Sequence, residues 1–532
     1  MSEPKVEVTM MRGTVILTVT SFIVKILSAI YRVPFQNLVG DEGFYVYQQV
    51  YPIYGIAMTL ALTGLPVYFS KMIAAEKSEL KRGELMKMFL VVVTGLSLLA
   101  FSVLYFGATW ISRAMGDPAL APLLKIVSVM FLLVPGLSTY RGFYQGQLQM
   151  KPTAISQLIE QGVRVAVILA AGGAYLSYGL TLYQMGGLAT AGSLVGGVAG
   201  LGILFLYSRK SKLPSVSWRH VPKASWRPFT RRLLREGGTL CFFSAYLVLF
   251  QLIDSFVVKQ ALEVGGLTGL EAKMAKGIFD RGQPLVQLGV VVAIAMTASF
   301  LPLLTKYYVM KEEQAYEQTV HSYFKVSLVI GSAASIGLSA VLPYINVTLF
   351  EDNSGEVALS VFVLSVFLVS MIQTYQTIYQ SQNLVRRQFI SALVGLSIKG
   401  VTSPILTIYL GTVGSSISTL LGLAVCWGML RFYLFRHQAR LKIEKGYVLK
   451  VIKSLVVMSV LLLVYRGVMS QLSWMSYGRV VSLITTLLGV VLGFTSYLMC
   501  VIHYQLFNDA EWTMVPFGKK IVKKINKTNK TN

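Results

Sequence analysis

The sequence predicts an all-α integral membrane protein with fourteen transmembrane helices, and three observations lead to this fold class. Hydrophobic residues make up 54% of the 532 residues and charged residues only 13%, a balance outside the range of soluble globular domains. The apolar residues gather in segments of about twenty, the length of helix that crosses a bilayer. The basic residues gather in alternate connections between these segments, which is typical of a multi-pass membrane protein.

The apolar segments define the expected helices in order along the chain. Lys25 interrupts the first segment and no small-residue cleavage site follows it, so we expect a membrane helix there and not a cleaved signal peptide. The segments lie near 12–33, 44–69, 87–110, 121–145, 154–174, 185–207, 236–258, 284–304, 323–345, 356–380, 388–410, 412–435, 449–469 and 480–503.

The basic residues predict the orientation of these helices. With the N-terminus in the cytoplasm, the cytoplasmic loops and tails hold 35 Lys and Arg, the outer loops hold 7, and 6 lie inside apolar segments. Basic residues resist translocation, so both termini are expected to be cytoplasmic. The net charge of +25 is then explained by topology and by anionic phospholipids as partners, and no nucleic acid is expected.

An internal repeat relates two parts of the chain. Residues 139–147 read TYRGFYQGQ and residues 374–382 read TYQTIYQSQ, an offset of 235 at which Arg164 also meets Lys399. Each copy spans six segments, and because six is even both copies have the same orientation, as in many secondary transporters. We therefore expect an N-lobe at 1–207, a basic cytoplasmic linker at 208–235, a C-lobe at 236–436, two added helices at 437–503 and a basic cytoplasmic tail at 504–532.

The linker has two interpretations. It carries nine Lys and Arg between Ser208 and Arg235, together with Trp218 and Trp226. It can form an amphipathic helix against anionic lipid, or it can simply set the topology.

Six basic residues inside the apolar segments are the first candidates for a functional role. Each costs about 3 kcal/mol to place in hydrocarbon, so each needs a polar partner, a water-filled cavity or a ligand. Lys25 and Arg32 share a helix face, and Lys125 and Arg32 lie near segment ends from which they can reach the interface. The six residues are Lys25, Arg32, Lys125, Arg141, Arg164 and Lys399.

Only two acids, Glu160 and Asp254, lie inside the apolar segments. Glu160 and Arg164 have the i,i+4 spacing of an ion pair on one helix face. Both acids are candidates for coupling to Na+ or H+, and both can equally serve as counter-ions for the buried cations. No other cofactor is expected.

Polar residues at two segment ends complete the candidate site. Arg141, Gln145 and Gln147 form a polar stripe near the inner end of the fourth segment, where they can bind a headgroup or link neighbouring helices. Arg281 lies at the outer start of the eighth segment, where it can line a cavity or be an ordinary residue at the start of a helix.

The excess of cations over acids predicts a cavity that attracts anions. Phosphate or pyrophosphate is the expected guest, because Arg binds such groups bidentately. The sequence contains no GxxxxGK[ST] run, no Ser/His/Asp set and no Cys/His cluster, so we expect a transporter and not an enzyme or a metal-binding protein.

Four stretches carry a resemblance to a known family. They read KILSAIYRVPFQNLVGDEGFYVYQQVYP (25–52), GLPVYFSK (64–71), YRGFYQGQLQMKPTAISQLIEQGVRV (140–165) and FDRGQPLVQL (279–288). The chain resembles, over nearly its whole length, the polysaccharide biosynthesis family typified by stage V sporulation protein B. That family belongs to the multidrug/oligosaccharidyl-lipid/polysaccharide exporter superfamily and includes the MurJ-type lipid II flippases.

The resemblance implies a MATE/MurJ-like V-shaped transporter whose central cationic cavity alternates between the two faces of the bacterial cytoplasmic membrane. It also implies a substrate with a polyprenyl tail, a pyrophosphate and a sugar head. By motif, Lys25 and Arg32 match a cavity arginine pair on the first helix, with Lys in place of the first Arg, and Arg281 matches an arginine of the eighth helix. The arginine of the second helix has no counterpart before Lys71, at the cytoplasmic end of that segment.

The sequence thus predicts a flippase of a polyprenyl-pyrophosphate-linked oligosaccharide, with a monomer expected and the oligomeric state open. Two alternatives stay open: a multidrug or organic-cation antiporter of the same superfamily, and a non-transporting scaffold for envelope or spore synthesis. The residues predicted to bind the anionic headgroup are Lys25, Arg32, Arg281, Arg164, Lys399, Arg141 and Gln145, with Asp254 and Glu160 as the ion-coupling acids.

Overall fold

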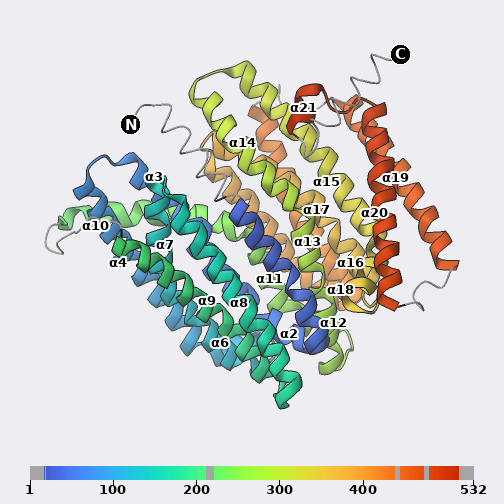
Figure 1. Cartoon of the computed structure of the whole chain (residues 1–532), viewed down its shortest axis with the longest axis horizontal. Coiled ribbons are helices and arrows are strands. Elements are labelled where there is room, and N and C mark those ends of the chain that lie inside the picture. The colour runs from blue at the N-terminus through green and yellow to red at the C-terminus, as the bar shows by residue number, and fades with distance from the viewer. Residues whose placement is uncertain (1–16, 18, 211–220, 438–443, 472–477, 515–532) are drawn as a thin grey trace. The chain divides into compact units, whose positions relative to one another are not determined.

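The structure is a computed structural model, and it describes residues 17, 19–210, 221–437, 444–471 and 478–514. Every regular element in these ranges is helical (Figure 1). Twelve helical stretches are long and apolar enough to cross a membrane. Two of them, Val19–Ala75 and Arg386–Arg436, contain 57 and 51 residues, more than one crossing needs at ~1.5 Å per residue. The all-α membrane fold is confirmed, and the number of fourteen crossings stays a prediction.

The chain divides into two compact units. Unit 1 consists of Met1–Pro284 and Lys399–Ser415, and unit 2 consists of Leu285–Ile398 and Ser416–Asn532. After helical residues 19–30, the elements of unit 1 are α2 (Arg32–Thr59), η1 (Leu60–Gly64), α3 (Leu65–Ala75), α4 (Glu79–Phe106), α5 (Ala108–Ala114), η2 (Pro118–Leu120), α6 (Ala121–Ser128), α7 (Met130–Gly146), α8 (Met150–Tyr178), α9 (Leu182–Lys210), α10 (Lys223–Arg232), η3 (Leu233–Gly237), α11 (Gly238–Val264) and α12 (Gly269–Asp280).

The remaining helices belong to unit 2 or to both units. The helices α13 (Gly282–Gly289) and α18 (Val385–His437) contribute residues to both. Those of unit 2 are α14 (Val291–Val309), α15 (Glu313–Phe350), α16 (Glu356–Val363), α17 (Ser365–Ser381), α19 (Lys445–Gln471), α20 (Gly478–His503) and α21 (Asp509–Met514). The expected lobe boundaries stay a proposal, since α11 and α12 pack on α2 within unit 1.

The first hydrophobic pass turns at Gly40, inside the stretch that the sequence placed in a loop. Gly40 has a φ of +70°, a left-handed conformation that favours glycine. Helix continues on both sides of it, and Gln36 donates a hydrogen bond to Asp41 across the turn (3.0 Å). Gly40 alone therefore forms the turn, and the hydrogen bond from Gln36 holds Asp41 directly after it.

The internal repeat extends to the helix breaks. One pair of helices, α6 and α7, breaks at Val129, and the pair α16 and α17 breaks at Leu364. In both pairs a helix of 8 residues is followed by one of 17 residues. Leu148 and Asn383, which follow the second helices, both have positive φ. The offset of 235 seen in the sequence thus relates local backbone geometry as well as residue types.

The helices α19 and α20 pack against α15 in unit 2, as Figure 1 shows at the red end of the chain. The Tyr497 hydroxyl of α20 donates to the carbonyl of Val329 on α15 (3.0 Å). On α19, Val460 and Leu463 are 52% and 62% exposed. Apolar side chains on such a surface are expected where lipid covers the helix.

The linker contains an amphipathic helix, and the predicted contact of this helix with anionic lipid stays a prediction. Phe229 of α10 and Leu233 are buried, while Arg227 and Arg231 are exposed. The apolar face packs on unit 1 and the basic face is free for solvent or headgroups. Trp218, residues 12–16 of the first expected segment and residues 515–532 of the expected tail lie outside the described residues.

Candidate functional site

Arg164 of α8 is the centre of a buried aromatic cluster in unit 1. Its guanidinium donates hydrogen bonds to the hydroxyl groups of Tyr31 (2.8 Å) and Tyr47 (3.2 Å) and to Oε1 of Gln161 (3.0 Å). Its central carbon lies 4.2 Å from the centre of the Tyr54 ring. Phenol oxygens and ring faces stabilise the cation, but none of these partners carries a negative charge.

Arg32, the first residue of α2, lies beside Arg164 and has fewer polar partners for its charge than Arg164 has. Its side chain is fully buried, and none of its three guanidinium nitrogens has a hydrogen-bond partner among the described residues. The guanidinium carbon lies 4.4 Å from the centre of the Tyr51 ring. Buried donors without partners cost about 1–3 kcal/mol each, so this arginine is poorly explained as a stabilising residue.

Tyr51 joins the two arginines. The guanidinium carbon of Arg164 lies 5.6 Å from the same ring centre, so the two cations are neighbours. As a residue Tyr51 is partly exposed, whereas Tyr31, Tyr47 and Tyr54 are buried. We call Arg32, Arg164, Tyr31, Tyr47, Tyr51 and Tyr54 the arginine–tyrosine cluster.

The local sequence of α2 explains why the tyrosines meet. Tyr47, Tyr51 and Tyr54 are spaced i, i+4 and i+7, which places them on one face of a helix. Tyr31 stands directly before α2 and its hydroxyl lies 3.0 Å from that of Tyr47. These tyrosines were not among the residues predicted from the sequence, although their heptad spacing beside two buried cations is a visible signal.

Arg141 of α7 is paired with Glu160 of α8, so of the two alternatives for Glu160 and Arg164 the i,i+4 ion pair does not form. Arg141 forms a buried ion pair with Glu160 and donates to Ser156 Oγ (2.8 Å). The reason is that Arg141, fully buried and without aromatic partners, requires a carboxylate. Arg164 instead points to the tyrosines of α2, which the i,i+4 argument could not anticipate.

Lys399 of α18 is paired with Asp254 of α11. Its Nζ lies 2.7 Å from Oδ2 of Asp254, and Ser415 Oγ donates to Oδ1 (3.4 Å). Both side chains are buried, and Nζ also lies 5.1 Å from the centre of the Phe250 ring. One predicted cation and one predicted acid therefore neutralise each other across two helices.

Arg281 and Lys276 pair with two further interior acids, Asp41 and Asp280, beyond the two predicted from the sequence. Arg281, between α12 and α13, donates from Nη2 to both carboxylate oxygens of Asp41 at 2.7 Å. Lys276 of α12 lies 2.6 Å from both carboxylate oxygens of Asp280. Asp41 and residues 269–280 had been placed in loops, and the structure packs both into the helical part of unit 1.

The remaining predicted residues, Lys25, Lys125 and Gln145, are not members of the arginine–tyrosine cluster. Lys25 is exposed on the first helix, and Lys125 is exposed with Nζ 5.6 Å from the Tyr105 ring centre. Gln145 is buried at the end of α7. Their predicted roles stay predictions.

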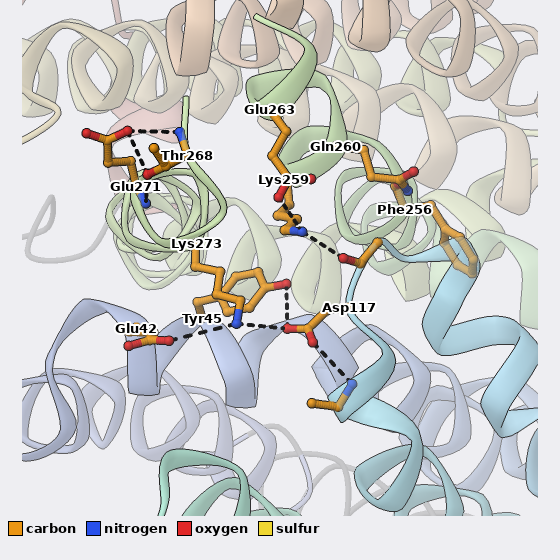
Figure 2. A network of polar contacts seen from close by, with 12 residues as sticks. Glu42, Tyr45, Asp117, Phe256, Lys259, Gln260, Glu263, Thr268, Glu271 and Lys273 are labelled. Atoms are coloured by element: carbon orange, nitrogen blue, oxygen red, sulfur yellow. Dashed lines mark hydrogen bonds and ion pairs between the residues drawn. The ribbon is translucent and has the colours of Figure 1, made fainter. Parts of the chain in front are cut away.

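A second polar network, absent from the sequence analysis, surrounds Asp117 (Figure 2). Its carboxylate accepts hydrogen bonds from the hydroxyl groups of Tyr45 (3.2 Å) and Tyr183 (2.7 Å). Lys273 of α12 lies between Asp117 and Glu42, 3.6 Å and 3.8 Å from their carboxylate oxygens. The network links α9 and α12 to the part of α2 that follows the break at Gly40.

Charge pairing singles out the arginine–tyrosine cluster as an anion site. Five other buried cations have a carboxylate partner: Arg141, Lys259, Lys276, Arg281 and Lys399. Within the part of the chain that the structure describes, Arg32 and Arg164 have none. Two neighbouring positive charges in a low-dielectric region attract a ligand that carries about two negative charges. No group of three or more His, Cys, Asp or Glu that could hold a metal occurs in the same ranges.

Comparison with known proteins gives the family. The polysaccharide biosynthesis protein family matches residues 10–308. A Bacillus subtilis relative, the uncharacterized membrane protein YabM, is 36% identical, with 96% of each chain covered. The chain belongs to the polysaccharide biosynthesis protein family. Two further B. subtilis members are the lipid II flippase MurJ, 25% identical over 92% of this chain and 94% of MurJ, and stage V sporulation protein B, 24% identical over 74% and 76%.

A solved structure shows the same fold. The lipid II flippase MurJ in an inward closed conformation matches with a TM-score of 0.69 at 14% identity, covering 92% of this chain and 99% of that chain. The chain is a multi-pass protein of the bacterial cytoplasmic membrane, and its fold is that of the multidrug/oligosaccharidyl-lipid/polysaccharide exporter superfamily. MurJ is named as a flippase, and the chain is not an enzyme.

Proposed function

We propose that this protein is a flippase that moves a polyprenyl-pyrophosphate-linked oligosaccharide from the cytoplasmic to the outer leaflet by alternating access. The observation that carries the proposal is the arginine–tyrosine cluster, in which Arg32 and Arg164 lie beside one ring without a carboxylate partner. The family relationship to a lipid II flippase supports a lipid-linked glycan as the substrate class.

A pyrophosphate matches this site in charge and in hydrogen bonding. The three nitrogens of Arg32 and Nε of Arg164 are buried donors without acceptors, and phosphate oxygens are strong acceptors for guanidinium groups. A bound pyrophosphate would therefore relieve both the unpaired charges and the unpaired donors. The ring of the partly exposed residue Tyr51 offers a surface beside the charged group on which a sugar or prenyl group can pack.

Three other residues predicted to bind the headgroup would do so only after their ion pairs open. Arg141, Arg281 and Lys399 are engaged with carboxylates, so they would reach the headgroup only in a state in which these pairs open. Glu160 and Asp254 would be the coupling acids in such an exchange, with Na+ or H+ as the coupling ion.

The antiporter alternative has less support. An organic cation needs a carboxylate in its site, and Glu160 and Asp254 are both already neutralised by buried cations. The scaffold alternative predicts that surface segments and not buried arginines matter, and the experiment below separates it from the flippase.

Native mass spectrometry of the purified protein tests the proposal. Wild type should retain a polyprenyl-pyrophosphate glycan, and Arg32→Met and Arg164→Met should each reduce its occupancy at least tenfold, about 1.4 kcal/mol or more of lost affinity. Lys151→Met is the matched control: Lys151 lies on the same helix as Arg164, is exposed, and should leave occupancy unchanged.

A thermal unfolding curve for each variant separates binding from folding. Arg32→Met should not lower the Tm, because the change removes three buried donors that have no hydrogen-bond partner. Retention of only bulk phospholipid by wild type, or equal glycan occupancy in Arg32→Met and wild type, would contradict the proposed site.

A further inference from the structure

In the buried Asp254–Lys399 pair, the lysine ammonium group lies where a cation bound to the Asp254 carboxylate would lie. The ammonium lies 2.7 Å from Oδ2, which is contact distance, and Oδ1 is faced by the hydroxyl of Ser415. Both residues are 0–1% exposed. The carboxylate comes from α11 and the ammonium from α18, so the pair also links two helices that are distant in the sequence.

A free metal cation would meet two obstacles at Asp254. It would have to displace an ammonium that is covalently tethered at the site and therefore present at a high effective concentration. If it bound beside the ammonium, the two positive charges would repel each other strongly in this low-dielectric region. The Ser415 hydroxyl, which faces Oδ1, is a neutral ligand and does nothing to offset this repulsion.

The nearest other charges do not favour a metal ion either. Asp280, which interacts electrostatically with Asp254, has its own lysine, Lys276, at 2.6 Å. That second pair is also buried and neutral, and Arg32 beyond it adds a positive charge. A site that binds a metal cation needs carboxylates that are not paired with a lysine. Around α11 and α12, Asp254 and Asp280 are each paired with a lysine ammonium group.

We propose that Lys399 is a tethered cation that occupies the cation position of Asp254 and closes this centre to Na+ and other free metal ions. The inference rests on the proposed function and deepens it. Two coupling ions, Na+ and H+, were considered for Asp254, and the inference excludes Na+ and retains H+. It does not depend on which substrate the protein moves, since it concerns the ion site alone.

Thermal unfolding of the purified protein in equal concentrations of sodium, potassium and choline chloride tests the inference without any transport substrate. Wild type should have the same Tm in the three salts. Lys399→Ala, which leaves Asp254 and Ser415 without the ammonium, should gain a Na+-specific rise in Tm of about 3 °C when Na+ is a hundredfold above its Kd. The double variant Asp254→Asn/Lys399→Ala is the matched control and should show no salt-specific rise.

Two results would overturn the inference. One is a Na+-specific rise in the Tm of wild type that Asp254→Asn removes. The other is a folded Lys399→Ala protein that shows no response to Na+. If Lys399→Ala does not fold, the wild-type comparison decides alone. The glycan-binding experiment on Arg32 and Arg164 is independent, so failure of the flippase proposal and failure of this one are distinguishable.

Discussion

At the scale of single residues, buried basic side chains in this protein have two different environments. Arg141 and Lys399 each contact a carboxylate, whereas Arg164 donates to phenol groups and Arg32 lies against the Tyr51 ring, with the Tyr31 phenol nearby. An ion pair neutralises its cation and leaves no need for a ligand, but aromatic contacts leave the positive charge in place. The second environment is therefore the one that marks a binding site.

Glu160→Gln tests the assignment of Arg141 as a structural cation. The change leaves the Arg141 guanidinium buried without a counter-charge, and we expect it to lower the free energy of unfolding by about 3–5 kcal/mol. The measurement is a denaturation curve in detergent or lipid. Arg141→Met/Glu160→Gln removes both charges and should recover most of the loss, and a single variant as stable as wild type would show that Glu160 does not support Arg141.

At the scale of the elements, the repeat has kept its helix geometry while its cations have diverged. The 8- and 17-residue helices recur at both copies, yet Arg164 faces tyrosines and its equivalent Lys399 faces Asp254. The contact of α12 with α2 is close, because a Cβ on Gly277 would lie 2.1 Å from the carbonyl oxygen of Asp41. Arg281, one turn later, pairs with the side chain of the same Asp41.

Gly277→Ala should therefore push α12 away from the turn at Asp41. We expect a loss of about 1–3 kcal/mol in unfolding free energy, as for other overpacked contacts, measured by denaturation. Gly162→Ala on α8 is the matched control: its Cβ would meet nothing within 4 Å, so the better helix propensity of alanine should leave stability unchanged or raise it by up to about 1 kcal/mol. Equal Tm values for the two variants would contradict the close contact of α12 and α2.

At the scale of the whole molecule, the charge asymmetry between loops predicts the orientation in the membrane. With 35 Lys and Arg on one side and 7 on the other, the cost of translocating basic loops decides which side is cytoplasmic. The predicted side includes the basic helix α10, whose exposed arginines can contact anionic headgroups.

Reporter fusions test the orientation and the even number of crossings together. A green fluorescent protein fused to the C-terminus should fluoresce, and alkaline phosphatase fused there should be inactive, because the C-terminus is expected in the cytoplasm. Alkaline phosphatase inserted after Gly179, in an expected outer connection, should be active. Phosphatase activity at the C-terminus would mean an odd number of crossings or the opposite orientation.

The sequence by itself determined the fold class, the repeat and the approximate helices, because these depend on hydropathy, on charge at segment ends and on residue identity at a fixed offset. It also singled out Arg32 and Arg164 as costly charges. It did not predict the partners. Which carboxylate neutralises which cation depends on contacts such as Arg141 with Glu160, or Lys399 with Asp254, that join helices far apart in the sequence. Only the tertiary structure decided these pairs, and with them which two arginines are left to bind an anion.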